Sequence, residues 1–196
     1  MKIKCSIFFD IDDVESFCKN ILHNDSKFEI NHEDDSVYLH EAITKNEMKS
    51  IPLKPELKLI DYEGYTFRQK DGVVINVNNV GDNFYTNLYN TWRVFGTKSL
   101  YLVIDTEGTY PAYMLNFYQG KTERVIYSIK DGARWVFFQK GEQQPFENGD
   151  LYSERGATKK FNYKKITSFC KNLGLSVEDP DFLTPTGPVY HTTVAK

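Results

Sequence analysis

The sequence predicts an α+β fold, in which an antiparallel β-sheet with about three packed helices forms one domain over residues 1–196. Three observations lead to this prediction. Tyr and Phe are abundant, at 13 and 14 of the 196 residues, and aromatic side chains pack well on a pleated sheet. Several apolar runs in the C-terminal half are joined by very short connections. Three other stretches carry apolar residues at helical spacing.

The C-terminal half predicts consecutive antiparallel strands. Four apolar or aromatic runs follow one another: Leu100–Ile104, Ala112–Tyr118, Arg124–Ile129 and Arg134–Gln139. Their connections contain Glu107-Gly108, Gln119-Gly120-Lys121 and Lys130-Asp131-Gly132. Such short connections leave no room for a crossover helix, whereas glycine suits a tight turn. We therefore expect an antiparallel meander in this part of the chain.

Three helices are predicted from capping residues and apolar periodicity. Asp12 can cap the first, and Glu15 stands three residues further on. The second helix ends at Gly96, which can adopt the left-handed conformation of a C-terminal cap. The third begins after Asn162 and ends at Gly174.

The N-terminal half predicts further strands. Residues 2–9 form the first, and Phe28–Ile30 and Val37–Leu39 form short ones on either side of a polar turn at Asn31–Asp35. Two more runs, Tyr65–Gln69 and Val73–Val77, are joined by Lys70-Asp71-Gly72 and predict a hairpin.

The last residues of the chain show no periodicity. Residues 176–196 contain Pro180, Pro185, Gly187 and Pro188. Proline cannot donate a backbone hydrogen bond to a sheet. We therefore expect residues 176–196 to form an extended tail on the surface.

The charge is unevenly distributed along the chain. Residues 1–63 hold 8 Lys or Arg and 14 Asp or Glu, whereas residues 64–196 have a net charge of +3. An acidic surface repels nucleic acid but attracts a basic protein. The candidate partner-binding residues are the acids near the first helix and the turn that follows it: Asp12, Asp13, Glu15, Glu33, Asp34 and Asp35.

The cysteines and histidines predict neither disulfides nor a metal site. Cys5, Cys18 and Cys170 are odd in number and have no metal-ligand spacing. His32 and His40 lie near three acids, but their spacing is not that of a metal site. No apolar run approaches the ~20 residues that span a bilayer. We therefore expect a cytoplasmic protein with free thiols, no cofactor and no membrane segment.

One catalytic alternative rests on Phe8-Phe9-Asp10-Ile11-Asp12-Asp13. This segment resembles the first motif of haloacid-dehalogenase-type phosphotransferases. The resemblance implies a Mg²⁺-dependent hydrolase or phosphotransferase with Asp10 as nucleophile and Asp12 as acid and base. It also implies a parallel, doubly wound sheet. The same aspartates can instead cap the first helix, where negative charge is favourable.

A second alternative is a nucleic-acid-associated module that uses residues 155–171. This run holds six basic residues and no acid: Arg155, Lys159, Lys160, Lys164, Lys165 and Lys171. Tyr152, Phe161 and Tyr163 are interleaved with them, and bases stack on such side chains. The sequence pI of about 5.8 is nevertheless low for this class of protein.

Residues 126–175 resemble the immunity proteins of bacterial polymorphic and contact-dependent toxin systems. The similarity lies in an aromatic strand at Arg134-Trp135-Val136-Phe137-Phe138, a turn at Gly141-Glu142-x-x-Pro145-Phe146-Glu147, and a helix that closes on Leu173-Gly174-Leu175. It implies a cytoplasmic protein that binds and neutralises one cognate toxin without catalysis of its own. We favour this function over the two alternatives.

Overall fold

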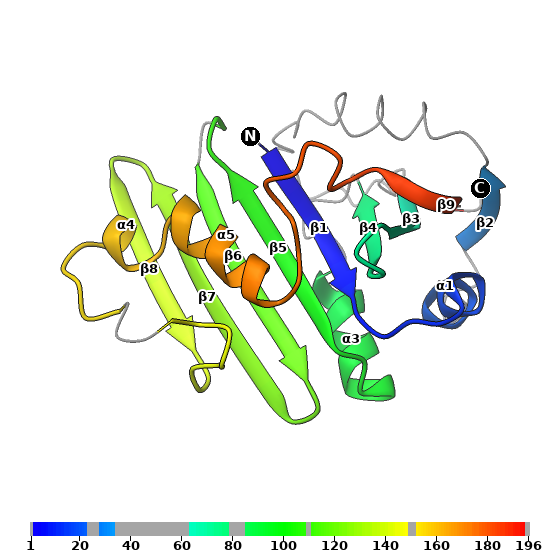
Figure 1. The fold of residues 1–196 in the computed structure, drawn as a ribbon, viewed down its shortest axis with the longest axis horizontal. Helices are drawn as coiled ribbons and strands as arrows, with labels where there is room; N and C mark the ends of the chain where they lie inside the picture. The colour runs from blue at the N-terminus through cyan, green and yellow to red at the C-terminus, as the bar shows by residue number, and fades with distance from the viewer. Residues whose placement is uncertain are drawn as a thin grey trace, which may run out of the picture.

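A computed structural model describes residues 2–22, 28–33, 63–78, 85–108, 111–148 and 152–194. These residues form one nine-stranded sheet in the order β2-β9-β3-β4-β1-β5-β6-β7-β8, in which neighbouring strands are antiparallel. The strands are β1 (Lys2–Phe8), β2 (Phe28–Glu33), β3 (Glu63–Gln69), β4 (Val74–Asn78), β5 (Ser99–Asp105), β6 (Ala112–Gln119), β7 (Thr122–Asp131), β8 (Arg134–Lys140) and β9 (Pro185–Val194). The helices are α1 (Val14–Leu22), α3 (Tyr85–Phe95), α4 (Ala157–Lys160) and α5 (Tyr163–Asn172) (Figure 1). The predicted α+β class with an antiparallel sheet is confirmed, and sheet predominates.

The four runs predicted as consecutive strands are β5, β6, β7 and β8. Sequential strands pair antiparallel: all of β5 with β6, all of β6 with β7, and residues 125–131 of β7 with all of β8. Gly120 and Gly132 occupy the two turns with φ values of +56°, a conformation that glycine adopts without steric cost. The predicted hairpin is also present, as β3 and β4.

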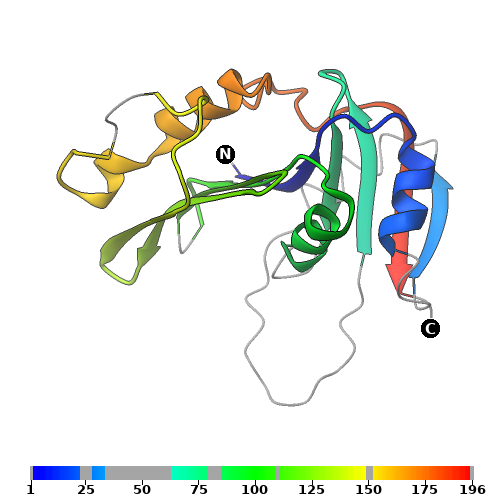
Figure 2. The ribbon, with the colours of Figure 1, turned by 90° about the horizontal axis from the view of Figure 1, so that it is seen from below.

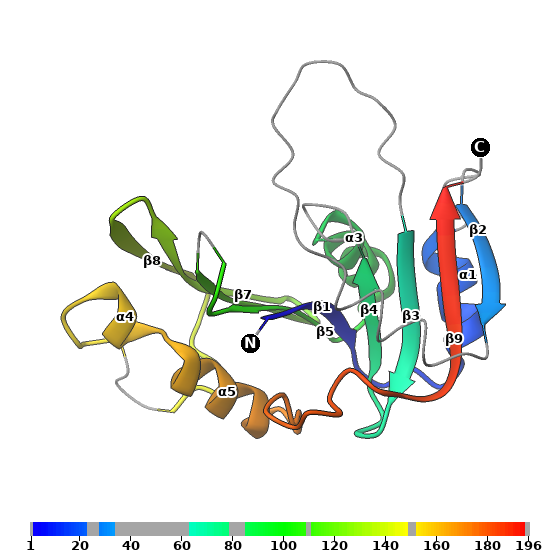
Figure 3. The same ribbon diagram turned by 90° about the horizontal axis from the view of Figure 1, so that it is seen from above.

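The sheet is covered on both faces, and it twists strongly. Figure 2 shows α5 and α3 on opposite sides of the sheet. On one face, Phe169 and Cys170 of α5 pack against a core that runs from β9 to β7. On the other face, Leu88 and Trp92 of α3 pack against residues of β1, β4, β5 and β6. In Figure 3 the strands β2, β9, β3 and β4 stand upright while β5–β8 are seen nearly edge-on, which is the right-handed twist accumulated over nine strands.

The expectation of a surface tail at residues 176–196 needs correction. Pro185–Val194 form β9, which lies inside the sheet between β2 and β3. Val189 and Thr192 are buried. The prediction of a tail rested on the prolines of this segment. The prolines of β9 lie at the start of the strand, beyond the reach of β2, because β2 pairs only with residues 189–194. Proline is tolerated at such a position.

Two other predicted boundaries differ from the structure. The cap of α1 is Asp13, whose carboxylate accepts a hydrogen bond of 3.0 Å from the Ser16 amide; Asp12 was therefore the wrong cap. Asn31–Glu33 continue β2, so the turn predicted from Asn31 is wrong for these three residues. The strand predicted at Val37–Leu39 lies outside the described residues. The third helix begins as expected, with the Asn162 side chain accepting from the Lys165 amide at 3.2 Å.

Candidate partner-binding surface

The loop between β1 and α1 is held against the β3–β4 hairpin by one arginine. The guanidinium of Arg68 donates hydrogen bonds to the backbone carbonyls of Ile11, Asp12 and Gly72, the last two at 3.0 and 2.9 Å. Carbonyl oxygens can satisfy the fixed donor fork of arginine without a carboxylate partner. Arg68 thus holds the loop through backbone carbonyls and does not engage the Asp12 carboxylate.

A hollow of about 380 Å³ opens beside this loop. It is lined by residues of the β1–α1 loop and helix start, β3 and β9: Asp12, Asp13, Val14, Arg68, Thr186, Gly187, Pro188 and Tyr190. Thr186 fixes one wall by donating its hydroxyl to the Arg68 carbonyl at 3.2 Å. The hollow therefore combines two carboxylates and the Arg68 guanidinium, whose hydrogen bonds go to backbone carbonyls, with the apolar surfaces of Val14, Pro188 and Tyr190.

Further acids lie at the β3–β4 turn, which contacts Arg68 through the Gly72 carbonyl. Asp71, in the β3–β4 turn, accepts a hydrogen bond of 3.2 Å from the Ser176 amide. Asp179 pairs with Lys70 of the same turn, and the hydrogen bond from Lys70 lowers the pKa of its carboxyl. Both partners are substantially exposed, so the pair contributes little to stability. These contacts bring the acid-rich segment at residues 176–181 to the β3–β4 turn.

The structure brings together only some of the predicted partner-binding residues. Asp12 and Asp13 line the hollow. Glu15 lies on the first turn of α1 and pairs with Lys19. Glu33 is the last residue of β2, where its backbone pairs with Val189 of β9, and Asp34 and Asp35 lie outside the described residues.

Sequence reasoning missed the residues that β9 and the preceding segment contribute. Thr186 and Tyr190 are separated from Asp12 by more than a hundred positions, and no periodicity links them. Burial raises the pKa of the Tyr190 phenol, and the nearby carboxylates of Glu15 and Asp13 raise it further. The Lys19 ammonium acts in the opposite direction, so the shift reflects the balance of the charges around the phenol.

The thiols are unsuited to nucleophilic chemistry. Burial raises the pKa of Cys5 and of Cys18 to about 12, and it raises the pKa of Cys170 as well. The reactive species is the thiolate, so these side chains stay protonated at neutral pH. Within the described residues, no cluster of three or more His, Cys, Asp or Glu side chains could hold a metal ion. In the same residues, no helix is both long and apolar enough to span a membrane.

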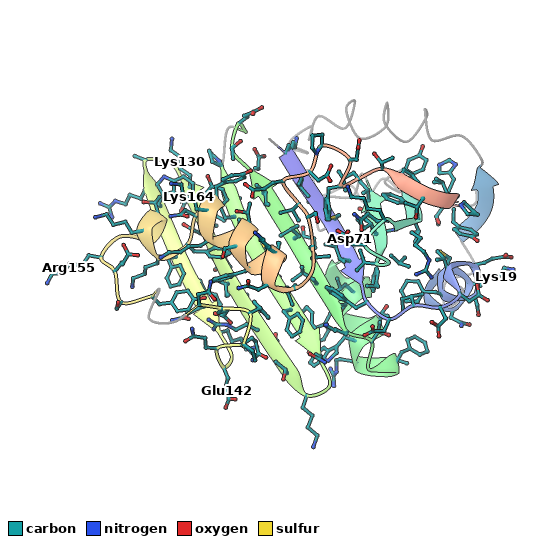
Figure 4. All side chains as sticks on the ribbon, viewed as in Figure 1. Lys19, Asp71, Lys130, Glu142, Arg155 and Lys164 are labelled. Carbon is teal, nitrogen blue, oxygen red and sulfur yellow. The ribbon has the colours of Figure 1, made fainter. Side chains whose placement is uncertain are left out.

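The aromatic residues of the basic run at 155–171 belong to the core. Phe161 is fully buried, and Tyr152 donates its hydroxyl to Glu147. Lys160 lies 5.4 Å from the ring centroid of Phe137. These rings are engaged within the fold, which weakens the nucleic-acid alternative. The exposed bases remain as a separate charged surface: Figure 4 shows Arg155 and Lys164 far from Lys19 of α1.

The fold also differs from the one that the phosphotransferase resemblance implies. Both neighbours of β1 run antiparallel to it, whereas that family has a parallel sheet. Asp10 is exposed and has a positive φ of 59°. Aspartate tolerates this conformation in turns, so the Asp10 backbone fits a simple connection between β1 and α1.

The turn at Gly141–Glu147, which carries part of the immunity-protein resemblance, is fixed by a buried ion pair. Arg124 is 2% exposed and donates to Glu147 from Nε at 2.8 Å and from one terminal nitrogen at 2.7 Å. The same guanidinium donates to the Gly141 carbonyl at 2.9 Å. Tyr152 donates to the second oxygen of the Glu147 carboxylate. This network fastens the chain that follows β8 onto β7, and its role is structural.

No family model, curated protein or solved structure matches the chain. We therefore infer its function from the chemistry of its surface. Among the residues that the structure describes, the hollow between the β1–α1 loop and β9 offers both carboxylates and apolar surface to a ligand, and we call it the acidic hollow.

Proposed function

We propose that the chain is a stoichiometric protein-binding inhibitor of immunity type, which neutralises a cognate bacterial toxin and has no catalytic step of its own. The observation that carries the proposal is the hollow lined by Asp12 and Asp13. A toxin that cuts nucleic acid is basic where it grips phosphate, so an acidic surface can cover that region.

The lining of the hollow suits a long basic side chain of the partner. Lysine and arginine pack their aliphatic stems on apolar surface and direct their charge toward a polar group. Val14, Pro188 and Tyr190 offer the apolar surface, and the carboxylates of Asp12 and Asp13 offer the counter-charge. The surrounding acids add a longer-range field that accelerates encounter with a basic partner.

The proposal is tested with the product of a neighbouring gene as the candidate toxin. Co-expression should restore growth, and the two purified proteins should bind with a stoichiometry of one to one. The variant Asp10→Asn with Asp12→Asn removes two exposed acids. We expect it to slow association by about tenfold at low salt, because steering charges act mainly on the on-rate. The difference should shrink at high salt, where charges are screened.

A matched control removes two acids at the other end of the molecule. Asp131 and Glu142 are both exposed, and Asp131→Asn with Glu142→Gln changes the net charge equally. This control should associate almost as fast as the unmodified chain. Equal association rates for both variants would show that the partner binds elsewhere. Mg²⁺-dependent hydrolysis of a phosphate ester that stops with Asp10→Asn would instead establish the phosphotransferase alternative.

A further inference from the structure

The strand β8 ends the sheet. It is the last strand in the order of the described residues, and all seven of its residues pair with β7 in one continuous register. Alternate backbone amides and carbonyls of such a strand point away from its only neighbour. They form a template to which another extended chain can add.

One face of β8 is apolar and exposed. Val136 and Phe138 lie opposite Ile129 and Tyr127 of β7, and Phe138 stacks on Tyr127 with ring centroids 5.0 Å apart. Both Val136 and Phe138 are 41% exposed. Exposed apolar side chains that adjoin across two strands are typical of an interaction surface.

The other face of β8 is covered. Phe137 stacks on Tyr152 at 5.7 Å, and Trp135 stacks on Tyr113 at 5.8 Å. Side chains alternate between the faces of a strand, so Val136 and Phe138 point to the side of the sheet that carries α3. The exposed Val94 and Phe95 belong to that helix.

β8 has few of the features that usually protect an edge strand. Natural proteins use proline, bulges, charged side chains such as Lys, or a covering helix or loop for this purpose, and of the charges β8 has only Arg134 and Lys140 at its two ends. The edge of β9 is protected in this way, because Pro185 and Pro188 lie where β2 does not reach. In β8 there is no proline, no bulge, and no charge between Arg134 and Lys140.

We propose that β8 receives an extended segment of a protein partner, which continues the sheet as an additional strand. On the exposed face β8 presents Arg134, Val136, Phe138 and Lys140, two basic residues around two apolar ones. The complementary segment has acids at its two ends and apolar residues at the alternate positions between them, because opposite charges across neighbouring strands stabilise their pairing. The proposal goes beyond the inhibitor function, since it needs neither the acidic hollow nor a toxin.

A second copy of the chain fits this edge less well. Antiparallel pairing of two β8 strands over all seven residues sets Arg134 opposite Lys140 at both ends. Like charges directly opposite each other destabilise a strand pair. The charge pattern therefore favours an acidic-ended segment of another protein.

The test uses two blocked heptapeptides with the full chain. Each has Val and Ile at its third and fifth positions and Thr between, and they differ in having Glu or Lys at both ends. Binding is measured from amide chemical shifts and from slowed hydrogen exchange in β8. We expect the Glu-ended peptide to bind about tenfold more tightly than the Lys-ended one, since two cross-strand charge pairs change sign.

A charge-reversal variant of β8 tests whether the peptide preference depends on its two basic residues. Arg134→Glu with Lys140→Glu should invert the preference between the peptides. This variant loses the exposed Lys140–Glu123 pair and sets an acid opposite Asp131 of β7, so its unfolding midpoint is measured beside its peptide preference. The control Lys164→Glu with Lys171→Glu makes the same charge change on exposed positions of α5, and it should keep the original preference.

Removal of the exposed apolar side chains of β8 provides an independent test. Val136→Thr with Phe138→Thr should abolish binding of both peptides while leaving the unfolding midpoint nearly unchanged, because both side chains are partly exposed and Thr suits a strand. The proposal is overturned if neither peptide slows exchange in β8, or if the preference ignores the charge reversal. It is also overturned if the free chain is a dimer that this apolar variant dissociates, because a second copy would then occupy the edge.

Discussion

The two halves of the sheet are assembled in different ways. From β5 to β8, each strand lies beside the next one in the sequence. In the other half, β2, β9 and β3 are neighbours although they comprise residues 28–33, 185–194 and 63–69. The first half is held by tight turns and the second by contacts between distant segments. A sequence pattern therefore identifies strands well, but it identifies which strands are neighbours only where the connections between them are short.

Removal of β9 should have the largest effect on the non-local half. A chain that ends at Thr184 leaves β2 and β3 without the strand that joins them, and it removes Val189 from the shared core. We expect the truncated chain to lose its cooperative unfolding transition in urea, because domains are stable by only about 5–15 kcal/mol. Because the core extends from β9 to β7, β5–β8 should lose their packing as well.

Two point variants of β9 test whether the truncated chain is destabilised by the loss of a buried side chain or by the missing strand as a whole. Val189→Ala, at a buried position, should lower the free energy of unfolding by about 1–3 kcal/mol. Pro188→Ala, at the exposed neighbouring position, should change it by less than about 0.5 kcal/mol. A truncated chain that unfolds like the full-length protein would contradict the position of β9 inside the sheet.

Sequence patterns predicted β5–β8 almost completely, because short glycine-containing connections determine which strands are neighbours. They also named Asp12 and Asp13 as candidate partner-binding residues, because both belong to the acid-rich first third of the chain. They could not place Thr186 and Tyr190 in the same site, because pairing of β9 with β3 depends on the packing of the whole sheet. The prolines of β9 favoured a tail, and only the position of β2 explains why the strand tolerates them.

Within the local half, the second largest effect is expected at the buried pair of Arg124 and Glu147. Arg124→Met leaves the Glu147 carboxylate buried and without its main partner, as Arg124 supplies two of its hydrogen bonds. Loss of one member of a buried pair costs about 3–5 kcal/mol. The measurement is the free energy of unfolding from urea titration.

Two comparisons test the cause of that loss. Arg124→Met combined with Glu147→Leu should recover part of the stability, because apolar residues often replace a buried ion pair at little cost. Lys140→Met breaks the exposed pair with Glu123 between β8 and β7 and should cost less than about 1 kcal/mol. If the double variant is less stable than Arg124→Met alone, the hydrogen bonds that Glu147 accepts from the Gln144 amide and from the Tyr152 hydroxyl matter more than the ion pair.

The smallest effect concerns the start of α1, where the acidic hollow and the fold share residues. The Asp13 carboxylate caps the helix by accepting a hydrogen bond from the Ser16 amide. Asp12, in contrast, accepts the hydrogen bond from Arg68 through its backbone carbonyl and not through its side chain. Asp13→Ala should therefore cost about 1 kcal/mol of folding stability, and Asp12→Ala should cost almost nothing. Thermal unfolding of the two variants beside the unmodified chain measures the difference. Equal losses would mean that Asp12 shares the cap, in which case a slower association of its variants could no longer be attributed to charge alone.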